Sequence, residues 1–229
     1  MNSHLLEPFG RVFEFTKHTP FTLEAVPEIK KTLEKEKLIV IRGAPIKDKE
    51  QFLDFSLAFS KKSDDIHERL LHWSFGPMME LKVDPKPENY LFSEEPVPFH
   101  WDGAFHREPS YLVFNCVAAP EADAGGETLF TEMSRVLKAM SDNEQELLKK
   151  LTLTYKTEKK AHYGGEVTIS PLFSHPRPGE TTLCYAVEAE TQLNPVELVM
   201  EGISSEAAKK HQKSHKEKIN DPRFCYKHQ

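Results

Sequence analysis

The chain has 229 residues, enough for one sizeable domain with a hydrophobic core. Its 30 Lys and Arg against 36 Asp and Glu give a net charge of −6, and no basic stripe stands out, which argues against nucleic acid as a partner. No apolar run has the length of a membrane span and the N-terminus lacks the pattern of a signal peptide, so we expect a soluble, cytoplasmic protein.

The first sixty residues predict alternating strands and helices. Residues 9–15 alternate apolar and polar side chains, which is typical of an edge strand. A helix is expected over residues 27–37, because it starts with proline and carries its apolar residues on one face. Residues 38–41 then predict a buried strand. Asp48 and Gln51 have the spacing of a capping box for a second helix, whose apolar stripe consists of Phe52, Phe55 and Phe59.

The stretch that follows predicts mostly surface connections. Residues 61–72 are rich in charged side chains, so we expect them to lie at the surface. Residues 78–83 predict a strand, and residues 84–88 contain two prolines and must form a loop.

The segment from Pro96 to Glu132 carries the residues with the clearest chemistry. His100 and Asp102 are one residue apart, so in an extended strand or strand end both side chains point to the same face. Non-haem Fe(II) oxygenases bind the metal through two His and one carboxylate, and leave its other face open for a cosubstrate and dioxygen. The pair therefore supplies two of three iron ligands, although such a triplet alone is a weak indication because it also occurs as a surface pair.

The remainder of the chain predicts short strands and three helical segments. Residues 111–119 predict a buried strand, and a turn ending at Gly125-Gly126 leads to a short strand over residues 127–130. Residues 133–151 predict helix, broken near Ser141, which can serve as a new N-cap. Further strands are expected over residues 151–157, 168–173, 181–187 and 223–226, and a polar helix over residues 204–219. Many short strands with helices mostly ahead of them favour an α+β protein built on a double-stranded β-helix, the jelly-roll core.

The three cysteines do not suggest a metal or redox motif. Cys116, Cys184 and Cys225 are widely spaced and form no C-x-x-C pair. Each is set among strand-like residues, so we expect buried thiols in a reducing compartment.

The order of the motifs resembles the TauD/TfdA family of Fe(II)- and 2-oxoglutarate-dependent dioxygenases. The shared order is H-x-D, then a strand, then GG-x-T-L-F, and the likeness extends from about Leu38 onward. Within the family the chain is most similar to PvcB-type enzymes of isonitrile biosynthesis, which share four short motifs: Trp73-Ser74-Phe75-Gly76, Phe99-His100-Trp101-Asp102-Gly103, Ala161-His162-Tyr163 and Leu193-Asn194-Pro195. Several separated motifs in the same order are far more specific than one triplet.

The resemblance implies a cofactor, a cosubstrate and a reaction class. Fe(II) would be bound by His100 and Asp102, and 2-oxoglutarate would be contacted by Thr128. With dioxygen, the enzyme would desaturate, hydroxylate or oxidatively decarboxylate a small molecule, such as an isonitrile derived from an aromatic amino acid. The family builds its substrate pocket from loops that flank the metal motif, so residues 89–98 form either a lid or a plain connection. Tyr163 either faces the active site or is a buried structural tyrosine.

One departure from the family concerns the end of the printed sequence. Family members carry a distal iron-binding His and a 2-oxoglutarate-binding Arg in a late segment, and neither can be named here. We therefore expect the single domain over residues 1–229 to be C-terminally incomplete. Five later histidines are candidates for the place of the distal ligand: His162, His175, His211, His215 and His228. His211 and His215 lie in a Lys-rich segment that predicts solvated helix residues, and His228 is interpreted as an ordinary strand residue.

Two other functions are consistent with the pattern at this point. The first is a catalytically inactive relative, or a fragment, that acts as a binding or regulatory protein. The second is a jelly-roll isomerase or metal-binding cupin, but the His-x-His signature of that class is missing from the sequence.

Overall fold

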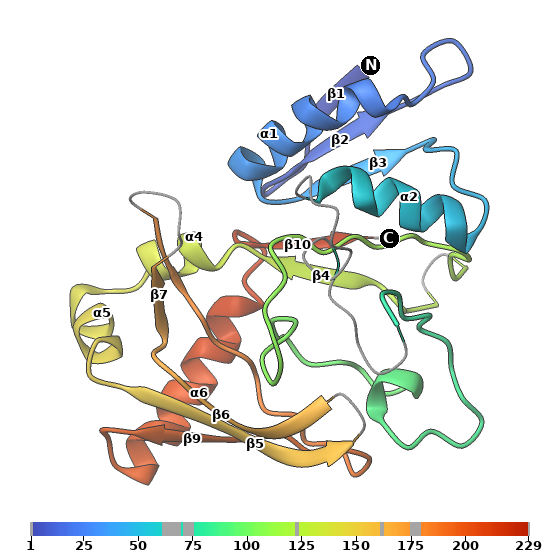
Figure 1. Cartoon of the computed structure of the whole chain (residues 1–229). Coiled ribbons are helices and arrows are strands. Elements are labelled where there is room, and N and C mark those ends of the chain that lie inside the picture. The colour runs from blue at the N-terminus through green and yellow to red at the C-terminus, as the bar shows by residue number, and fades with distance from the viewer. Residues whose placement is uncertain are drawn as a thin grey trace. The chain divides into compact units, whose positions relative to one another are not determined.

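The computed structural model describes residues 2–60, 70, 76–121, 124–160, 163–174 and 180–228 (Figure 1). Backbone contacts divide the chain into two compact units, which are described separately. Unit 1 comprises Met1–His72, Ser110–Glu132 and Pro222–Gln229, and unit 2 comprises Trp73–Pro109 and Met133–Asp221. Both units combine helices with short strands, as the sequence predicts for an α+β protein.

Unit 1 contains a three-stranded sheet in the order β1-β2-β3. Its strands are β1 (Asn2–Leu5), β2 (Arg11–Glu14) and β3 (Ile39–Arg42). β2 pairs antiparallel with β1 and parallel with β3, so the strand predicted at residues 9–15 exists but is central, and its assignment to an edge was wrong. The prediction failed because β1, the neighbour of β2, lacks the alternating apolar pattern from which a strand is predicted.

The two helices of unit 1 begin where the sequence predicts. These are α1 (Val26–Glu36) and α2 (Lys49–Phe59), preceded by the 3-10 turn η1 (Leu23–Ala25). The Asp48 carboxylate accepts a hydrogen bond from the Gln51 amide at 2.8 Å and caps α2. The Gln51 side chain instead accepts from the Lys47 amide, so only half of the predicted capping box forms.

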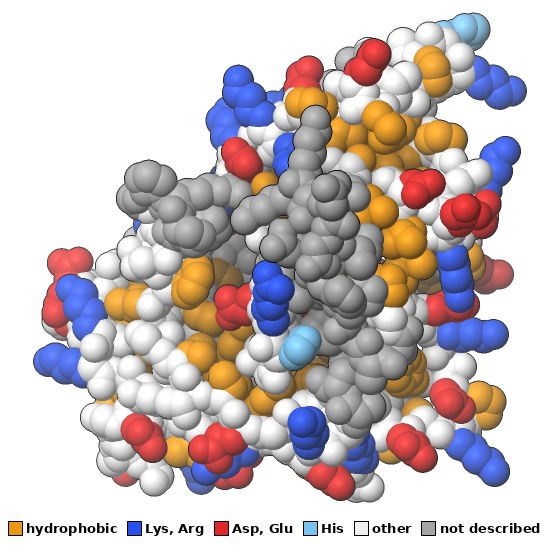
Figure 2. All heavy atoms as spheres, viewed as in Figure 1, with side chains coloured by type: hydrophobic (Ala, Val, Ile, Leu, Met, Phe, Trp, Pro, Cys, Tyr) orange, Lys and Arg blue, Asp and Glu red, His pale blue; other side chains and the backbone are white. Residues whose placement is uncertain are grey.

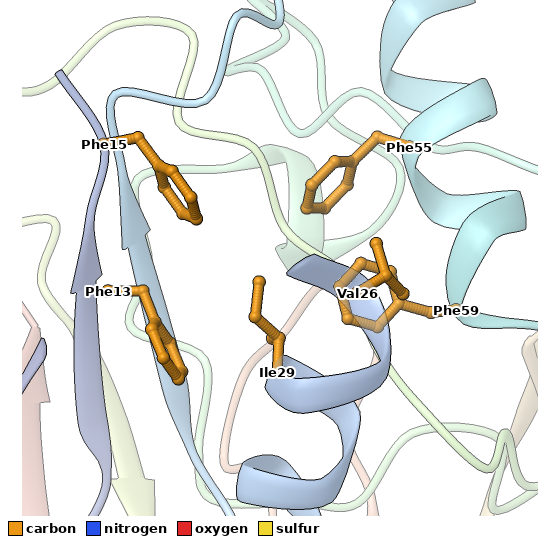
Figure 3. Close-up of a cluster of buried hydrophobic side chains, with 6 residues drawn as sticks. All are labelled: Phe13, Phe15, Val26, Ile29, Phe55 and Phe59. Carbon is orange, nitrogen blue, oxygen red and sulfur yellow. The ribbon is translucent and has the colours of Figure 1, made fainter. Parts of the chain in front are cut away.

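The core of unit 1 lies between the sheet and the two helices. Figure 3 shows six buried side chains that point toward one another: Phe13 and Phe15 from β2 and its end, Val26 and Ile29 from α1, and Phe55 and Phe59 from α2. Burial of each such side chain contributes about 1.5–3 kcal/mol. Of the predicted stripe on α2, Phe55 and Phe59 are thereby confirmed as core, whereas Phe52 is only half-buried.

Unit 1 also contains the pair β4 (Thr128–Thr131) and β10 (Cys225–His228), which run antiparallel. The strand predicted over residues 111–119 was wrong: this stretch forms no strand, and Val117 is 87% exposed. An apolar run becomes a buried strand only where a neighbour pairs with its backbone, and none of the described strands does so here. Cys116 lies in this stretch and is exposed, whereas Cys184 and Cys225 are half-buried, so the expectation of three buried thiols was also wrong.

Unit 2 is built on a three-stranded antiparallel sheet in the order β6-β5-β9 and a two-stranded hairpin. Its elements are η2 (Tyr90–Phe92), α4 (Met133–Lys138), α5 (Asp142–Leu148), β5 (Thr152–Lys160), β6 (Tyr163–Ile169), β7 (Leu172–Ser174), β8 (Thr181–Leu183), β9 (Glu197–Glu201) and α6 (Ser205–Ile219). α6 packs against β9 and α4 (Figure 1). Ser141 begins α5 through a complete capping box with Glu144, which confirms the predicted helix break.

Several strand predictions in unit 2 need correction. The strand expected over residues 168–173 is divided between β6 and β7, with Pro171 in the gap, because proline cannot donate to the ladder. Residues 78–83 form an exposed irregular segment and no strand. β9 was not predicted, although its Leu198 and Met200 pair with β5 and are buried.

Candidate metal centre

His100 lies in an irregular segment and is oriented by its own backbone. Pro96 and Pro98 precede it, which removes two amide donors and prevents the segment from joining a sheet. The His100 Nδ1 atom lies 2.8 Å from the Pro98 carbonyl oxygen. A carbonyl only accepts, so Nδ1 carries the hydrogen and Nε2 keeps its lone pair for another ligand. This is how a metal-binding histidine is commonly prepared.

Asp102 lies beside His100, as the sequence predicts. The distance between His100 Nε2 and Asp102 Oδ1 is 3.8 Å, and the two side chains are 43% and 41% exposed. Neither belongs to a strand: Asp102 opens a turn in which the His106 amide donates to the Gly103 carbonyl. The extended strand expected for the pair was therefore wrong, although the two side chains still lie close together.

Trp101, between the two polar residues, attaches the triplet to its surroundings. Its ring packs edge-on against Tyr155 at 5.3 Å, and its Nε1 donates to the Glu108 carboxylate at 2.9 Å. Tyr155 is fixed in turn, because its hydroxyl donates to the Ala186 carbonyl and accepts from the Ala186 amide. The triplet therefore combines two exposed polar side chains with one that packs on the core.

The turn after Asp102 requires glycine. Gly103 has φ 83°, and a Cβ atom there would lie 2.1 Å from the Arg107 carbonyl oxygen. The backbone is anchored on the other side by the Val187 amide, which donates to the Phe99 carbonyl at 2.8 Å.

The donor set of this pair fits a divalent cation such as Fe(II). Two ligands about 2.1 Å from a metal and at right angles lie about 3 Å apart, so His100 Nε2 and Asp102 Oδ1 would approach by less than about 1 Å. Within the described part of the chain, no group of three His, Cys, Asp or Glu side chains is placed to hold a metal ion. The pair has the donor types of two of the three protein ligands that a non-haem iron site requires.

The later histidines occupy different positions. His162 and His175 lie outside the described residues. His228 is part of β10, as predicted, and its Nδ1 is 3.3 Å from the Tyr226 hydroxyl. His215 is 2% exposed and packs edge-on against Tyr185 at 4.9 Å, so its interpretation as a solvated residue was wrong. Burial lowers the pKa of His215 to about 4, with smaller contributions from neighbouring charges.

Thr128 is the first residue of β4 and pairs with His228 of β10. Its side chain is exposed, in unit 1, whereas His100 and Asp102 belong to unit 2. Glu127, one residue earlier, is ion-paired with Lys227 at 2.6 Å, and the hydrogen bond from Lys227 lowers the pKa of the carboxyl.

The segment before the metal motif is held by other residues of unit 2 at several points. Asn89 caps η2, and Tyr90 is buried. The Lys160 ammonium donates to the Glu88 and Leu193 carbonyls, at 3.0 and 2.9 Å. Of the two interpretations of residues 89–98, these contacts favour the plain connection. Lys160 was not predicted to have a structural role, because it lies in a charged stretch typical of solvated residues.

Charged side chains of both signs are interspersed on the face shown in Figure 2. This pattern agrees with the near balance of 30 Lys and Arg against 36 Asp and Glu. In the part of the chain that the structure describes, no helix is long and apolar enough to cross a membrane.

Comparisons with known proteins were made for sequence and for structure. The profile of the "Taurine catabolism dioxygenase TauD, TfdA family" matches residues 2–229. The 3-((Z)-2-isocyanoethenyl)-1H-indole synthase of Fischerella ambigua is 35% identical over 229 residues, covering 98% of this chain and 81% of that protein. Tyrosine isonitrile desaturase of Pseudomonas aeruginosa is 32% identical over 139 residues, covering 58% and 47%. The solved structure of PvcB, described as an Fe, alpha-ketoglutarate dependent oxygenase from an isonitrile synthetic pathway, superimposes with TM-score 0.73 and 23% identity over 96% of this chain and 73% of that one.

Proposed function

The chain belongs to the TauD/TfdA family of dioxygenases, and from this premise we propose that it catalyses Fe(II)- and 2-oxoglutarate-dependent oxidation of a small molecule. The observation that carries the proposal is the pairing of His100 Nε2 with Asp102 Oδ1 at 3.8 Å, while Nδ1 is held by the Pro98 carbonyl. The match of the family profile over residues 2–229 supports one catalytic domain with a jelly-roll core.

His100 and Asp102 would hold the iron in this proposal. Bound Fe(II) supplies the activation of dioxygen that protein side chains cannot perform. The Pro98 carbonyl keeps His100 in the tautomer that presents Nε2, and the Asp102 carboxylate offsets part of the positive charge. The third ligand would be a histidine outside the described residues or beyond Gln229, so the completion of the jelly roll by further sequence stays a prediction.

Thr128 is proposed to contact 2-oxoglutarate. Its hydroxyl is exposed at the start of β4, where it can donate a hydrogen bond to a carboxylate oxygen. The backbone pairing of β4 with β10 fixes the position of this side chain.

The substrate is proposed to be an isonitrile derived from an aromatic amino acid, and the reaction a desaturation. Support comes from the two relatives, one named for an isocyanoethenyl indole and the other for tyrosine isonitrile.

The proposal is tested by anaerobic titration of the protein with Fe(II) and 2-oxoglutarate, recording the visible charge-transfer band of the chelate. The wild-type protein is expected to give a band that saturates at one iron per chain. His100→Ala and Asp102→Ala should each abolish it, whereas Thr128→Ala should leave Fe(II) binding measured by calorimetry unchanged and weaken only 2-oxoglutarate binding. His106→Ala is the matched control, because it removes an exposed imidazole from the same turn.

Two results would contradict the proposal. If wild-type protein binds neither Fe(II) nor 2-oxoglutarate, this chain is no dioxygenase and the inactive-relative interpretation gains support. If the band survives both substitutions with unchanged midpoint, iron binds elsewhere and the assignment of His100 and Asp102 is wrong.

A further inference from the structure

Two phenols meet in the same compact unit as the candidate metal centre. Tyr90 belongs to η2 and Tyr163 begins β6, yet their hydroxyl oxygens lie 3.1 Å apart. The rings pack edge-to-face with centroids 6.3 Å apart. Tyr90 is 3% exposed and Tyr163 is half-buried, so Tyr163 is the phenol that a ligand reaches more easily.

The hydrogen bonds of this pair leave one donor unused. Two hydroxyl groups carry two hydrogens, and only one of them is needed for the bond between the oxygens. Within the described part of the chain, neither hydroxyl has a second hydrogen-bond partner. A buried donor that stays unpaired is unfavourable, so the second hydrogen is available for an acceptor on a bound molecule.

The pair is connected to the metal motif in two ways. Burial raises the pKa of Tyr90, and the negative charge of Asp102 raises it further, so the phenol lies within electrostatic range of that carboxylate. Phe105, at the end of the turn that Asp102 opens, packs edge-on against the Tyr163 ring at 5.4 Å. A molecule bound beside His100 and Asp102 would therefore be close to these hydroxyls.

Two hydrogen bonds hold the segment that carries Tyr90 in place. The Asn89 side chain accepts from the Leu91 amide at 2.9 Å and holds η2, while Lys160 donates to the carbonyl of Glu88. Donors that are held in place before binding lose little entropy when a ligand arrives.

We propose that Tyr90 and Tyr163 act as a relay that donates one hydrogen bond, through the Tyr163 hydroxyl, to a carboxylate of a molecule bound at the metal centre. The inference rests on the proposed function, because the substrate class there is an amino-acid derivative that carries a carboxylate. Burial raises the pKa of both phenols, so they stay neutral donors at neutral pH and do not repel an anion. A hydrogen bond to a charged acceptor is about twice as strong as one between neutral groups.

The carboxylate has two sources, the substrate and 2-oxoglutarate, and binding measurements distinguish them. The probes are the isonitrile of tyrosine, its methyl ester, and 2-oxoglutarate, each titrated by calorimetry into anaerobic Fe(II)-loaded protein. Tyr163→Phe removes the hydroxyl and keeps the ring that packs on Phe105. If the substrate supplies the carboxylate, Tyr163→Phe should weaken binding of the acid about 10- to 100-fold. The same substitution should weaken binding of the ester by less than about threefold.

Tyr90→Phe should have a smaller effect in the same direction, because it removes only the inner member of the relay. Tyr111→Phe, in unit 1, controls for loss of a phenol hydroxyl as such. If Tyr163→Phe weakens binding of 2-oxoglutarate and leaves binding of the substrate acid unchanged, the relay binds the cosubstrate carboxylate. If Tyr163→Phe binds the isonitrile of tyrosine and 2-oxoglutarate as tightly as the wild type, the inference is overturned. It is also overturned if Tyr163→Phe loses only affinity for Fe(II), because the tyrosine pair would then serve to position Asp102. The charge-transfer band of wild-type protein reports on the proposed function independently.

Discussion

Acidification should destabilise the protein through one buried histidine on α6. His215 faces the ring of Tyr185 and the side chain of His211, and it senses the charges of Lys218 and Glu144. Its Nδ1 atom is buried without a hydrogen-bond partner among the described residues. Protonation would place a positive charge in this apolar site next to another cation, so the folded protein holds His215 neutral.

The sign and size of the effect follow from the two pKa values. The pKa of His215 is about 4 in the folded protein and 6.5 when exposed. Between these values the unfolded chain binds more protons, so stability is complete above pH 6.5 and is lost as the pH falls toward 4. Between pH 7 and pH 5 the free energy of unfolding should fall by about 2 kcal/mol, at about 1.4 kcal/mol per pKa unit.

Urea unfolding at several pH values, followed by circular dichroism, measures this directly. His215→Leu should remove most of the decrease between pH 7 and pH 5, because leucine fills the site without binding a proton. His18→Leu, which changes an exposed histidine of unit 1, should keep the wild-type slope. Equal slopes for wild type and His215→Leu would show that the buried imidazole does not control acid stability.

Two further substitutions test the packing that supports the site and the fold. Lys160→Met should lower the free energy of unfolding by about 2–4 kcal/mol, because it removes two charge-assisted hydrogen bonds to the Glu88 and Leu193 carbonyls. Lys156→Met, at an exposed position of the same strand, is the control and should change the free energy of unfolding in urea by no more than about 0.5 kcal/mol. Ile29→Ala should cost about 2–5 kcal/mol in the same assay, because the side chain is fully buried at the centre of the unit 1 core; a loss below about 1 kcal/mol would contradict that packing.

Helices were predictable because their signals are local. Asp48, Ser141 and Ser204 each precede a helix and cap it, and a side chain that bonds an amide three residues later needs nothing from the rest of the chain. Strands depend on partners that the sequence does not identify. The apolar run at residues 111–119 has a strand-like composition but no described neighbour, whereas β1 has a polar composition and pairs with β2.

In the candidate site, too, local features were predictable and long-range contacts were not. The spacing of His100 and Asp102 predicted that they would lie together, because one intervening residue restricts the distance whatever the exact backbone. Tyr90 and Lys160 were not predicted, since each contacts the site region through residues more than thirty positions away. His215 was misassigned because a Lys-rich stretch says nothing about which helix face packs inward.

The packing of Trp101 makes the residue between the two polar side chains more than a spacer. His100 and Asp102 are exposed, and alone they would depend on a short irregular segment for their separation. The indole binds that segment to Tyr155, whose hydroxyl is bonded at both donor and acceptor positions to Ala186. Cation binding by the pair would therefore be thermodynamically linked to the folding of unit 2. A change that loosens the core around Tyr155 would let the distance between His100 and Asp102 vary more widely. A cation bound by the pair would in turn stabilise that core.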